Sequence, residues 1–215
     1  MMTTNLILVV VVLTNLKLLG SRRLGASIRV VAIQGVVLGL LPILAHLHEL
    51  SVRFALLALG TIAIKGIVFP WLLFRALREA EVTREIEPYV GYVASLVVGV
   101  LALAVSFWIC TSTQLRIPPD IASPWLAPIS FFSIFAGLFL IVSRKRAVSQ
   151  VLGFLIMENG IYTFGVGVVS GTPLLVEAGV LLDVFVAVFV MGIIIFHINR
   201  EFDHIESDRL STLKD

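Results

Sequence analysis

The sequence predicts an all-α integral membrane protein, a bundle of about seven transmembrane helices with its amino terminus outside and its carboxyl terminus in the cytoplasm. Of its 215 residues, 59% are hydrophobic and only 14% are charged, which leaves too little polar surface for a soluble domain of this length. Apolar runs long enough to cross a bilayer follow one another along the chain. Lys and Arg are concentrated in every second connection between these runs.

Each apolar run provides about the 20 residues that a helix needs to cross a hydrocarbon core of about 30 Å. Short polar or turn-forming segments such as 20–23 and 171–173 separate them. The first run has no basic segment before it and no small-residue cleavage site, so we expect a retained helix rather than a signal peptide. The seven runs cover residues 4–20, 25–46, 52–76, 88–110, 124–143, 147–169 and 174–198.

The basic residues predict the orientation of these spans. With the amino terminus outside, 13 of the 16 Lys and Arg lie on the cytoplasmic side, in the segments 17–29, 75–84, 144–146 and 200–214. Only Arg53 and Arg116 fall on the other side, and Lys65 lies within the membrane. Cytoplasmic connections of membrane proteins carry such an excess of Lys and Arg. We therefore expect a multi-pass protein of the plasma or inner membrane.

Three regions follow from the order of the runs. Residues 1–123 form a four-helix membrane region, residues 124–198 form a three-helix region, and residues 199–215 form a cytoplasmic tail too short for a core of its own. The single cysteine, Cys110, excludes an internal disulfide and a Cys-rich metal or iron–sulfur site. The chain has no Gly-rich phosphate loop, zinc-ligand spacing or nucleophile elbow, so we expect no cofactor and no metal. Nucleic-acid binding is not expected either, because the basic residues flank apolar helices.

Ionisable side chains in the middle of apolar runs are the main functional signal. Lys65, Glu158 and Asp183 lie near the centres of the third, sixth and seventh runs. A charge at the bilayer centre costs at least about 2.5–3.5 kcal/mol on insertion scales, so such residues tend to pair or to move ions and protons. One base and two acids at a similar depth predict a charge-relay path.

Each of these residues also has a simpler interpretation. Glu158 lies about 18 Å along its helix from the Arg144 cluster, and its simpler interpretation is a neutral glutamic acid that only fixes helix packing. Asp183 reaches a similar depth on an adjacent antiparallel helix, where it could instead be structural glue to a partner's Lys. Glu177 lies near the outer mouth of the same helix and is either an entrance group or a solvated interfacial residue.

Lys65 lies one turn before Pro70 in the third run. Because proline has no N–H, the carbonyl near residue 66 loses its helical partner, which loosens the helix and could admit water. Lys65 is therefore either a group that releases and rebinds a proton or a static counter-ion for an acid, either Glu158 or a carboxylate of a partner. Asn15 and Gln34 are expected mostly to form packing hydrogen bonds. Gly35 and Gly39 form a Gly-x-x-x-Gly pattern that favours close helix packing.

The segment from residue 129 to residue 215 resembles the K subunit of respiratory complex I and the C subunit of multisubunit cation/proton antiporters. The matching pieces are the basic loop 142–146, the stretch Gly-Phe-Leu-Ile-Met-Glu-Asn-Gly at 153–160 and the acid-bearing stretch 180–187. With its additional amino-terminal spans, the whole chain is more similar to hydrogenase-4 component E of energy-converting hydrogenases and formate hydrogenlyase complexes. Met-Glu-Asn-Gly is the most specific of these motifs.

The pattern departs from the K subunit at both acids. The second-helix Glu of that subunit aligns with Leu155, whereas here the acid follows three residues later at Glu158, about 4.5 Å further along the helix. The third-helix Glu is replaced by Asp183. The role of each acid is expected to carry over, but its detailed geometry is not.

The resemblance implies a non-catalytic membrane-arm subunit, without a redox site of its own, that continues a chain of buried charges for proton or cation translocation. Its implied partners are antiporter-like membrane subunits and membrane subunits similar to the H subunit of complex I, together with the lipid bilayer. A passive scaffold subunit, a subunit of a multisubunit antiporter and an autonomous secondary transporter are the alternatives. The autonomous transporter is disfavoured because no repeat relates residues 1–110 to residues 111–215.

Overall fold

The computed structural model describes residues 2–41, 52–79, 88–113 and 123–168, and every regular element in these ranges is a helix, which confirms the all-α expectation for them. A π-helical segment, η1, joins α4 to α5, so residues 52–79 form one continuous helix. The elements are α1 (Met2–Leu19), α2 (Leu24–Gly39), α4 (Val52–Ala63), η1 (Ile64–Val68), α5 (Phe69–Glu79), α6 (Tyr92–Ser112), α7 (Leu126–Ser143) and α8 (Ala147–Val168).

Three helical stretches in the described residues are long and apolar enough to cross a membrane, namely Ala58–Arg78, Tyr92–Ser112 and Leu126–Ser143. Thr3–Leu19 and Leu24–Gly39 are shorter apolar helices. The described helices overlap the first six of the seven expected runs, and the run 174–198 lies outside the described residues. The chain therefore has the character of a membrane protein, while the count of seven spans and their orientation stay predictions.

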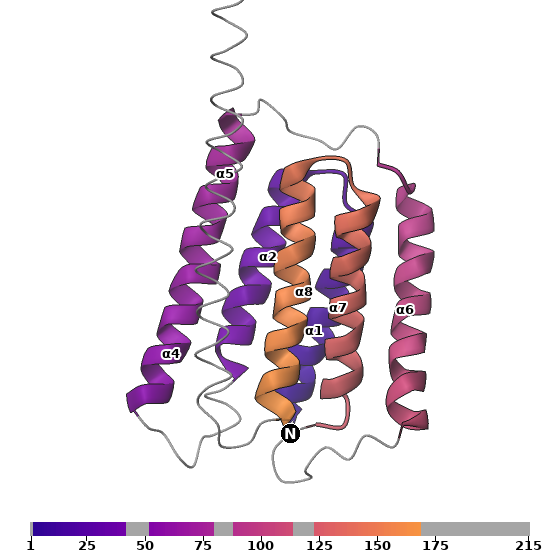
Figure 1. The fold of residues 1–215 in the computed structure, drawn as a ribbon. Helices are drawn as coiled ribbons and strands as arrows, with labels where there is room; N and C mark the ends of the chain where they lie inside the picture. The colour runs from indigo at the N-terminus through magenta and orange to yellow at the C-terminus, as the bar shows by residue number, and fades with distance from the viewer. Residues whose placement is uncertain (1, 42–51, 80–87, 114–122, 169–215) are drawn as a thin grey trace, which may run out of the picture.

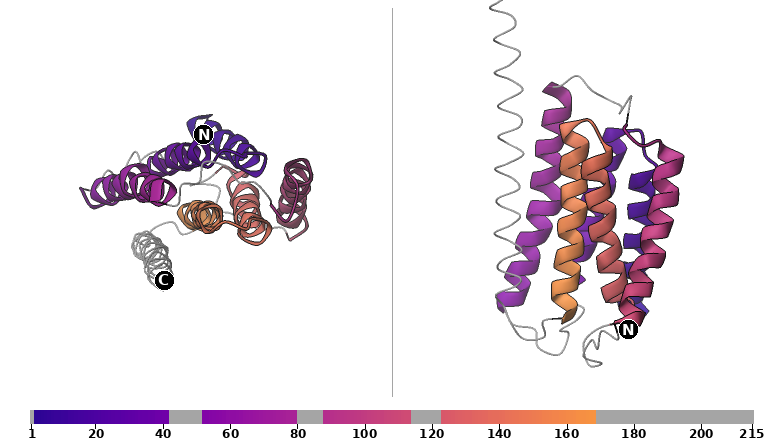
Figure 2. Two further views of the ribbon diagram at one scale, coloured as in Figure 1. Left: turned by 90° about the horizontal axis from the view of Figure 1, so that it is seen from above. Right: turned by 45° about the vertical axis from the view of Figure 1, so that its right-hand side comes forward.

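The helices form two facing rows (Figures 1 and 2). In one row α2 packs between α1 and the continuous helix of α4, η1 and α5, and in the other row α7 packs beside α8. Helix α1 contacts α7 and α2 contacts α8, while α6 closes one edge against α7 and α1. Side chains on the facing sides of α2 and α8 therefore meet between the rows.

Glycines bring α7 and α8 into close contact. A Cβ atom added at Gly137 would lie 2.5 Å from the Gly153 carbonyl oxygen, and one at Gly160 would lie 2.8 Å from the Ser130 carbonyl oxygen. Real Cβ atoms are not found at such distances, so these positions require glycine. Gly160 thus serves helix packing, and α8 is held firmly at the level of Glu158.

Most basic residues of the described helices, apart from Arg53 and Lys65, gather at one end of the bundle, which we call the basic end. It contains the turn between α1 and α2, the carboxyl end of α5 and the turn between α7 and α8 (Figure 1). Arg144 is buried here and its Nη2 donates to the Leu19 carbonyl oxygen at 2.7 Å, so that a cation caps the carboxyl end of α1. The guanidinium carbons of Arg144 and Arg22 lie 4.7 and 4.8 Å from the ring centre of Tyr92.

Candidate functional site

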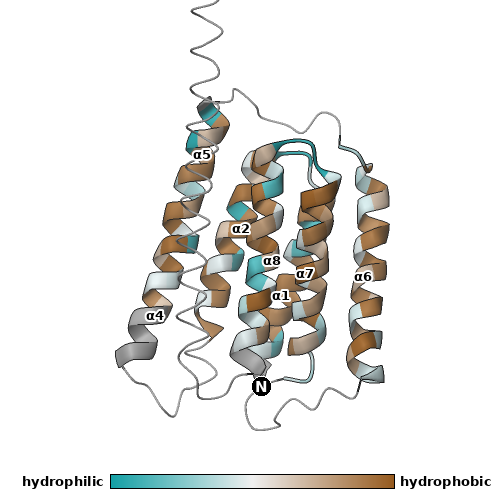
Figure 3. Cartoon of the chain, viewed as in Figure 1, coloured by the Kyte–Doolittle hydropathy of each residue, from teal (hydrophilic) through white to brown (hydrophobic). Residues whose placement is uncertain are grey.

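A band of polar residues crosses the middle of the otherwise apolar helices (Figure 3). Its members are buried side chains from α1, α2, η1, α7 and α8: Asn15, Gln34, Lys65, Ser133, Glu158 and Asn159. A buried polar group is costly unless it is hydrogen-bonded, so the partners of each member decide what the band does.

Lys65 is held in the π-helical segment η1. The Phe69 N–H donates to the Ile64 carbonyl, five residues back rather than four, and Pro70 has no N–H. The Phe69 N–H, which an α-helix would direct to the Lys65 carbonyl, is thus directed to the Ile64 carbonyl instead. The Gly66 carbonyl has no α-helical donor because residue 70 is proline. The loosening expected from Pro70 thus takes the form of a π-helical turn at the lysine itself.

Close packing of α2 brings the backbone of this segment into the bundle. A Cβ atom at Gly35 would lie 2.6 Å from Lys65 Cβ, and one at Gly39 would lie 2.6 Å from Ile62 Cγ1. Both distances are too short for any residue but glycine, so the Gly-x-x-x-Gly pattern has the packing role expected of it. This close approach places the lysine stem against α2 and directs its amine toward α8.

The amine of Lys65 meets α8 at an ion pair. Lys65 Nζ lies 2.6 Å from Glu158 Oε1 and donates to Asn159 Oδ1 at 2.9 Å. It also lies 5.1 Å from the ring centre of Tyr162, within range of a cation–π contact. The side chains of Lys65 and Glu158 are only 4% and 1% exposed. Of the two partners that the sequence left open for Lys65, the structure shows Glu158 of the same chain.

The two oxygens of Glu158 differ in their surroundings. Oε1 accepts the hydrogen bond from Lys65, whereas Oε2 is buried and has no hydrogen-bond partner within the described residues. A carboxylate oxygen has room for more than one hydrogen bond, and a proton bound at Oε2 would leave the bond at Oε1 in place. Within the described residues, only one of the two carboxylate oxygens of Glu158 is therefore held by a partner.

A row of amides extends the ion pair across the bundle. Asn159 Nδ2 donates to Gln34 Oε1 at 3.5 Å, and Gln34 Nε2 donates to Asn15 Oδ1 at 2.9 Å. Asn15 Nδ2 then donates to Ser133 Oγ at 2.8 Å, and Ser133 donates to the Ile129 carbonyl at 3.0 Å. Every donation runs in one direction, away from Lys65. Since an ammonium only donates, the oxygen of the Asn159 amide must face Lys65 and its NH₂ group must face away. This orientation in turn fixes the orientations of the Gln34 and Asn15 amides.

The structure therefore joins two of the four predicted site residues, Lys65 and Glu158. The other two, Asp183 and Glu177, lie outside the described residues. Asn15 and Gln34 form the packing hydrogen bonds expected of them, whereas Asn159 had no expected role of its own from sequence. The signal for Asn159 was a shared depth: Gln34 and Asn159 both lie near the centre of their helices, as Lys65 and Glu158 do. Among the described residues, no group of three His, Cys, Asp or Glu side chains could hold a metal ion.

Comparison with known proteins finds a similar chain in a bacterium. Over 205 residues the sequence is 32% identical to the uncharacterized protein Rv0085 of Mycobacterium tuberculosis, and the match covers 95% of this chain and 92% of the relative. No family model matches the sequence. No solved structure matches it either.

Proposed function

The chain belongs to the family of the Mycobacterium tuberculosis protein Rv0085, and we propose that it is a non-catalytic membrane-arm subunit of an energy-converting complex of the hydrogenase-4 or complex I type. In this role Lys65 and Glu158, together with Asp183 and Glu177, contribute to the translocation of protons or cations. One observation carries the proposal: a buried ion pair joins two apolar helices and is extended by hydrogen bonds to α1 and α7.

The chemistry of the pair supports transfer rather than mere adhesion. Lysine releases its proton more readily than arginine, which keeps its charge at any accessible pH. Glu158 Oε2 offers a second site for a proton beside the one that Lys65 holds. Ionisable groups at membrane depth are costly and mark ion and proton pathways. A proton could therefore pass between lysine and carboxylate, a distance of 2.6 Å, without movement of either helix.

The proposed topology has seven spans, with the basic end in the cytoplasm. It is supported by Arg22, Arg75, Arg78 and Arg144, which belong to the α1–α2 turn, the carboxyl end of α5 and the α7–α8 turn. These three parts lie at one end of the bundle (Figure 1). Reporter fusions after Thr83 and Ser211 should both read as cytoplasmic, and one after Pro119 should read as external. A cytoplasmic signal after Pro119 would overturn this topology.

Glu158→Gln is the decisive variant for the proposed function. The amide retains an oxygen for Lys65 but cannot gain or lose a proton in the working range of pH. We expect the complex to assemble and its ion translocation to fall by about a hundredfold or more, the typical contribution of a positioned acid or base. Glu158→Asp should retain part of the activity because it keeps the titratable group. Glu79→Gln, the same chemical change at the end of α5, is the matched control.

A structural scaffold is the competing function, and the same network gives it support. A chain of satisfied hydrogen bonds across five elements would hold an assembly together without moving any proton. In that case Glu158→Gln would translocate ions at the normal rate, and only substitutions that break the assembly would reduce it. Intact assembly together with unchanged translocation would therefore favour the scaffold.

A further inference from the structure

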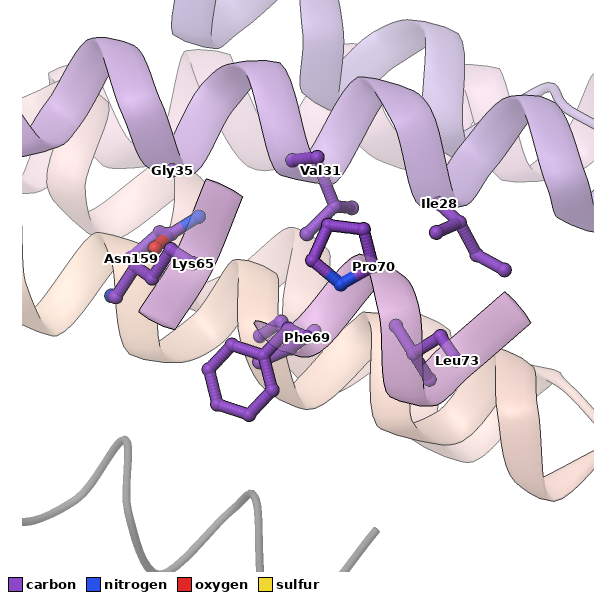
Figure 4. Close-up of a pocket in the computed structure, with 10 residues that line it drawn as sticks. Ile28, Val31, Gly35, Lys65, Phe69, Pro70, Leu73 and Asn159 are labelled. Carbon is purple, nitrogen blue, oxygen red and sulfur yellow. Dashed lines mark hydrogen bonds between the residues drawn. The ribbon is translucent and has the colours of Figure 1, made fainter. Parts of the chain in front are cut away.

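A small cavity lies beside Lys65, between α2, the π-helical segment with α5, and α8 (Figure 4). Its volume is about 10 Å³, close to the smallest that holds one water molecule. Gly35, Lys65 and Asn159 line one end, and Ile28 and Leu73 line the other. At the Lys65 end, Gly35 lies directly against the Lys65 stem, and the helix is π-helical before Pro70.

The lining of the cavity extends toward the basic end. Along α2 it runs from Gly35 back to Ile28, a distance of about 10 Å at 1.5 Å per residue. Along α5 it runs forward to Leu73, two residues before Arg75. Both directions lead away from Lys65 toward the same end of the bundle. The cavity is thus elongated between the buried ion pair and the basic end.

Polar groups that a water could use are concentrated at the inner end. A buried water usually makes about three hydrogen bonds to protein groups. Pro70 offers no N–H to the Gly66 carbonyl, and the Lys65 amine and Asn159 amide lie at the same level. The remaining walls are apolar, so a water has one favourable position, next to Lys65.

We propose that this cavity is a water site and the inner end of a proton access route from the basic end to Lys65. This inference rests on the proposed function, and it specifies the route by which the ion reaches Lys65 and the identity of the ion, a proton. A proton leaves the Lys65 ammonium to the water, giving a neutral amine and hydronium, and it returns by the reverse step. The described lining contains no carboxylate, so a sodium ion stripped of its water would lack an anionic ligand there. The route therefore suits protons passed through water.

Cysteine accessibility tests the route without any turnover. In a Cys110→Ser background, pairs of neighbouring positions on one helix share depth and burial but differ in whether they line the cavity. Leu155→Cys lines it and Ile156→Cys does not, and Leu73→Cys and Leu72→Cys form a second pair. The probe is Ag⁺, which is small, enters through water and binds thiols. Unreacted thiols are then counted with a fluorescent maleimide after denaturation, in vesicles that contain the assembled protein.

The lining member of each pair should react faster than its neighbour by at least about tenfold, the ratio given by a barrier difference of about 1.4 kcal/mol. It should also react faster when Ag⁺ is added on the side of the basic end. Equal rates within both pairs, or faster reaction from the opposite side, would overturn the proposal. Failure of the access route can be distinguished from failure of the proposed function, because Ag⁺ access is measured at rest whereas the effect of Glu158→Gln is measured by ion translocation. If one pair fails to fold, the other alone decides.

Discussion

Replacing Lys65 with methionine removes the amine of the ion pair while retaining a long apolar side chain. Glu158 then loses the donor 2.6 Å from its Oε1, and Asn159 loses the donor 2.9 Å from its Oδ1. With both members of the pair almost fully buried, little water is available to replace the lost contacts. Breaking a buried pair by removing one partner typically costs about 3–5 kcal/mol. For a chain of this size such a loss lowers the midpoint of thermal unfolding by on the order of 10 °C.

Thermal unfolding in detergent measures this effect, and a double variant identifies its cause. Lys65→Met combined with Glu158→Gln leaves no uncompensated charge, so it should regain at least half of the lost stability. Lys17→Met, which removes an exposed amine on α1, should change the midpoint by no more than about 2 °C. A Lys65→Met variant that unfolds within about 2 °C of the unmodified protein would refute the stabilising role of the pair. A double variant less stable than either single variant would refute it as well.

Three further predictions concern the surroundings of the pair. Gly35→Ala places a Cβ atom 2.6 Å from Lys65 Cβ, so it should destabilise the fold by about 1–3 kcal/mol in thermal unfolding, whereas Gly60→Ala, which meets open space, should not. Gln34→Leu leaves Asn15 Oδ1 and Asn159 Nδ2 without these partners at about 1–3 kcal/mol each, so it should lower the unfolding midpoint by more than Gln150→Leu, which removes one hydrogen bond to the Arg144 carbonyl at an exposed position. Ala32→Val fills the cavity beside Lys65 and should slow the reaction of Ag⁺ with Leu155→Cys by about tenfold, and an unchanged rate would contradict the cavity as the route.

Helix positions were predictable because lipid imposes simple rules on sequence. A span needs about 20 apolar residues, and a charge inside it is conspicuous, so the first six runs and the central places of Lys65 and Glu158 could be read directly. Gly35 and Gly39 likewise signalled close packing by their spacing. These features depend on the length of one apolar run or on the spacing of residues along one helix face, and both can be seen in the sequence.

The pairing of helices was harder to predict, because it depends on rotation about each helix axis. Lys65 could have faced Glu158 or a partner's carboxylate, and only the packing of α2 between its neighbours decides between them. To predict the hydrogen-bonded row of Asn15, Gln34 and Asn159, the rotations of α1, α2 and α8 about their axes must all be known. The π-helical turn was foreseen only as a loosening near Pro70, since proline predicts a lost hydrogen bond but not how the helix accommodates it.

Ion translocation by a Lys65→Arg variant tests the central claim most directly. Arginine keeps the positive charge and reaches the same carboxylate, so a static counter-ion would tolerate the change. It holds its proton at any accessible pH, so a group that must release one would not. We predict a complex that assembles normally and whose proton translocation in vesicles is lost. Normal assembly with normal translocation would contradict the account and leave Lys65 as a structural partner of Glu158.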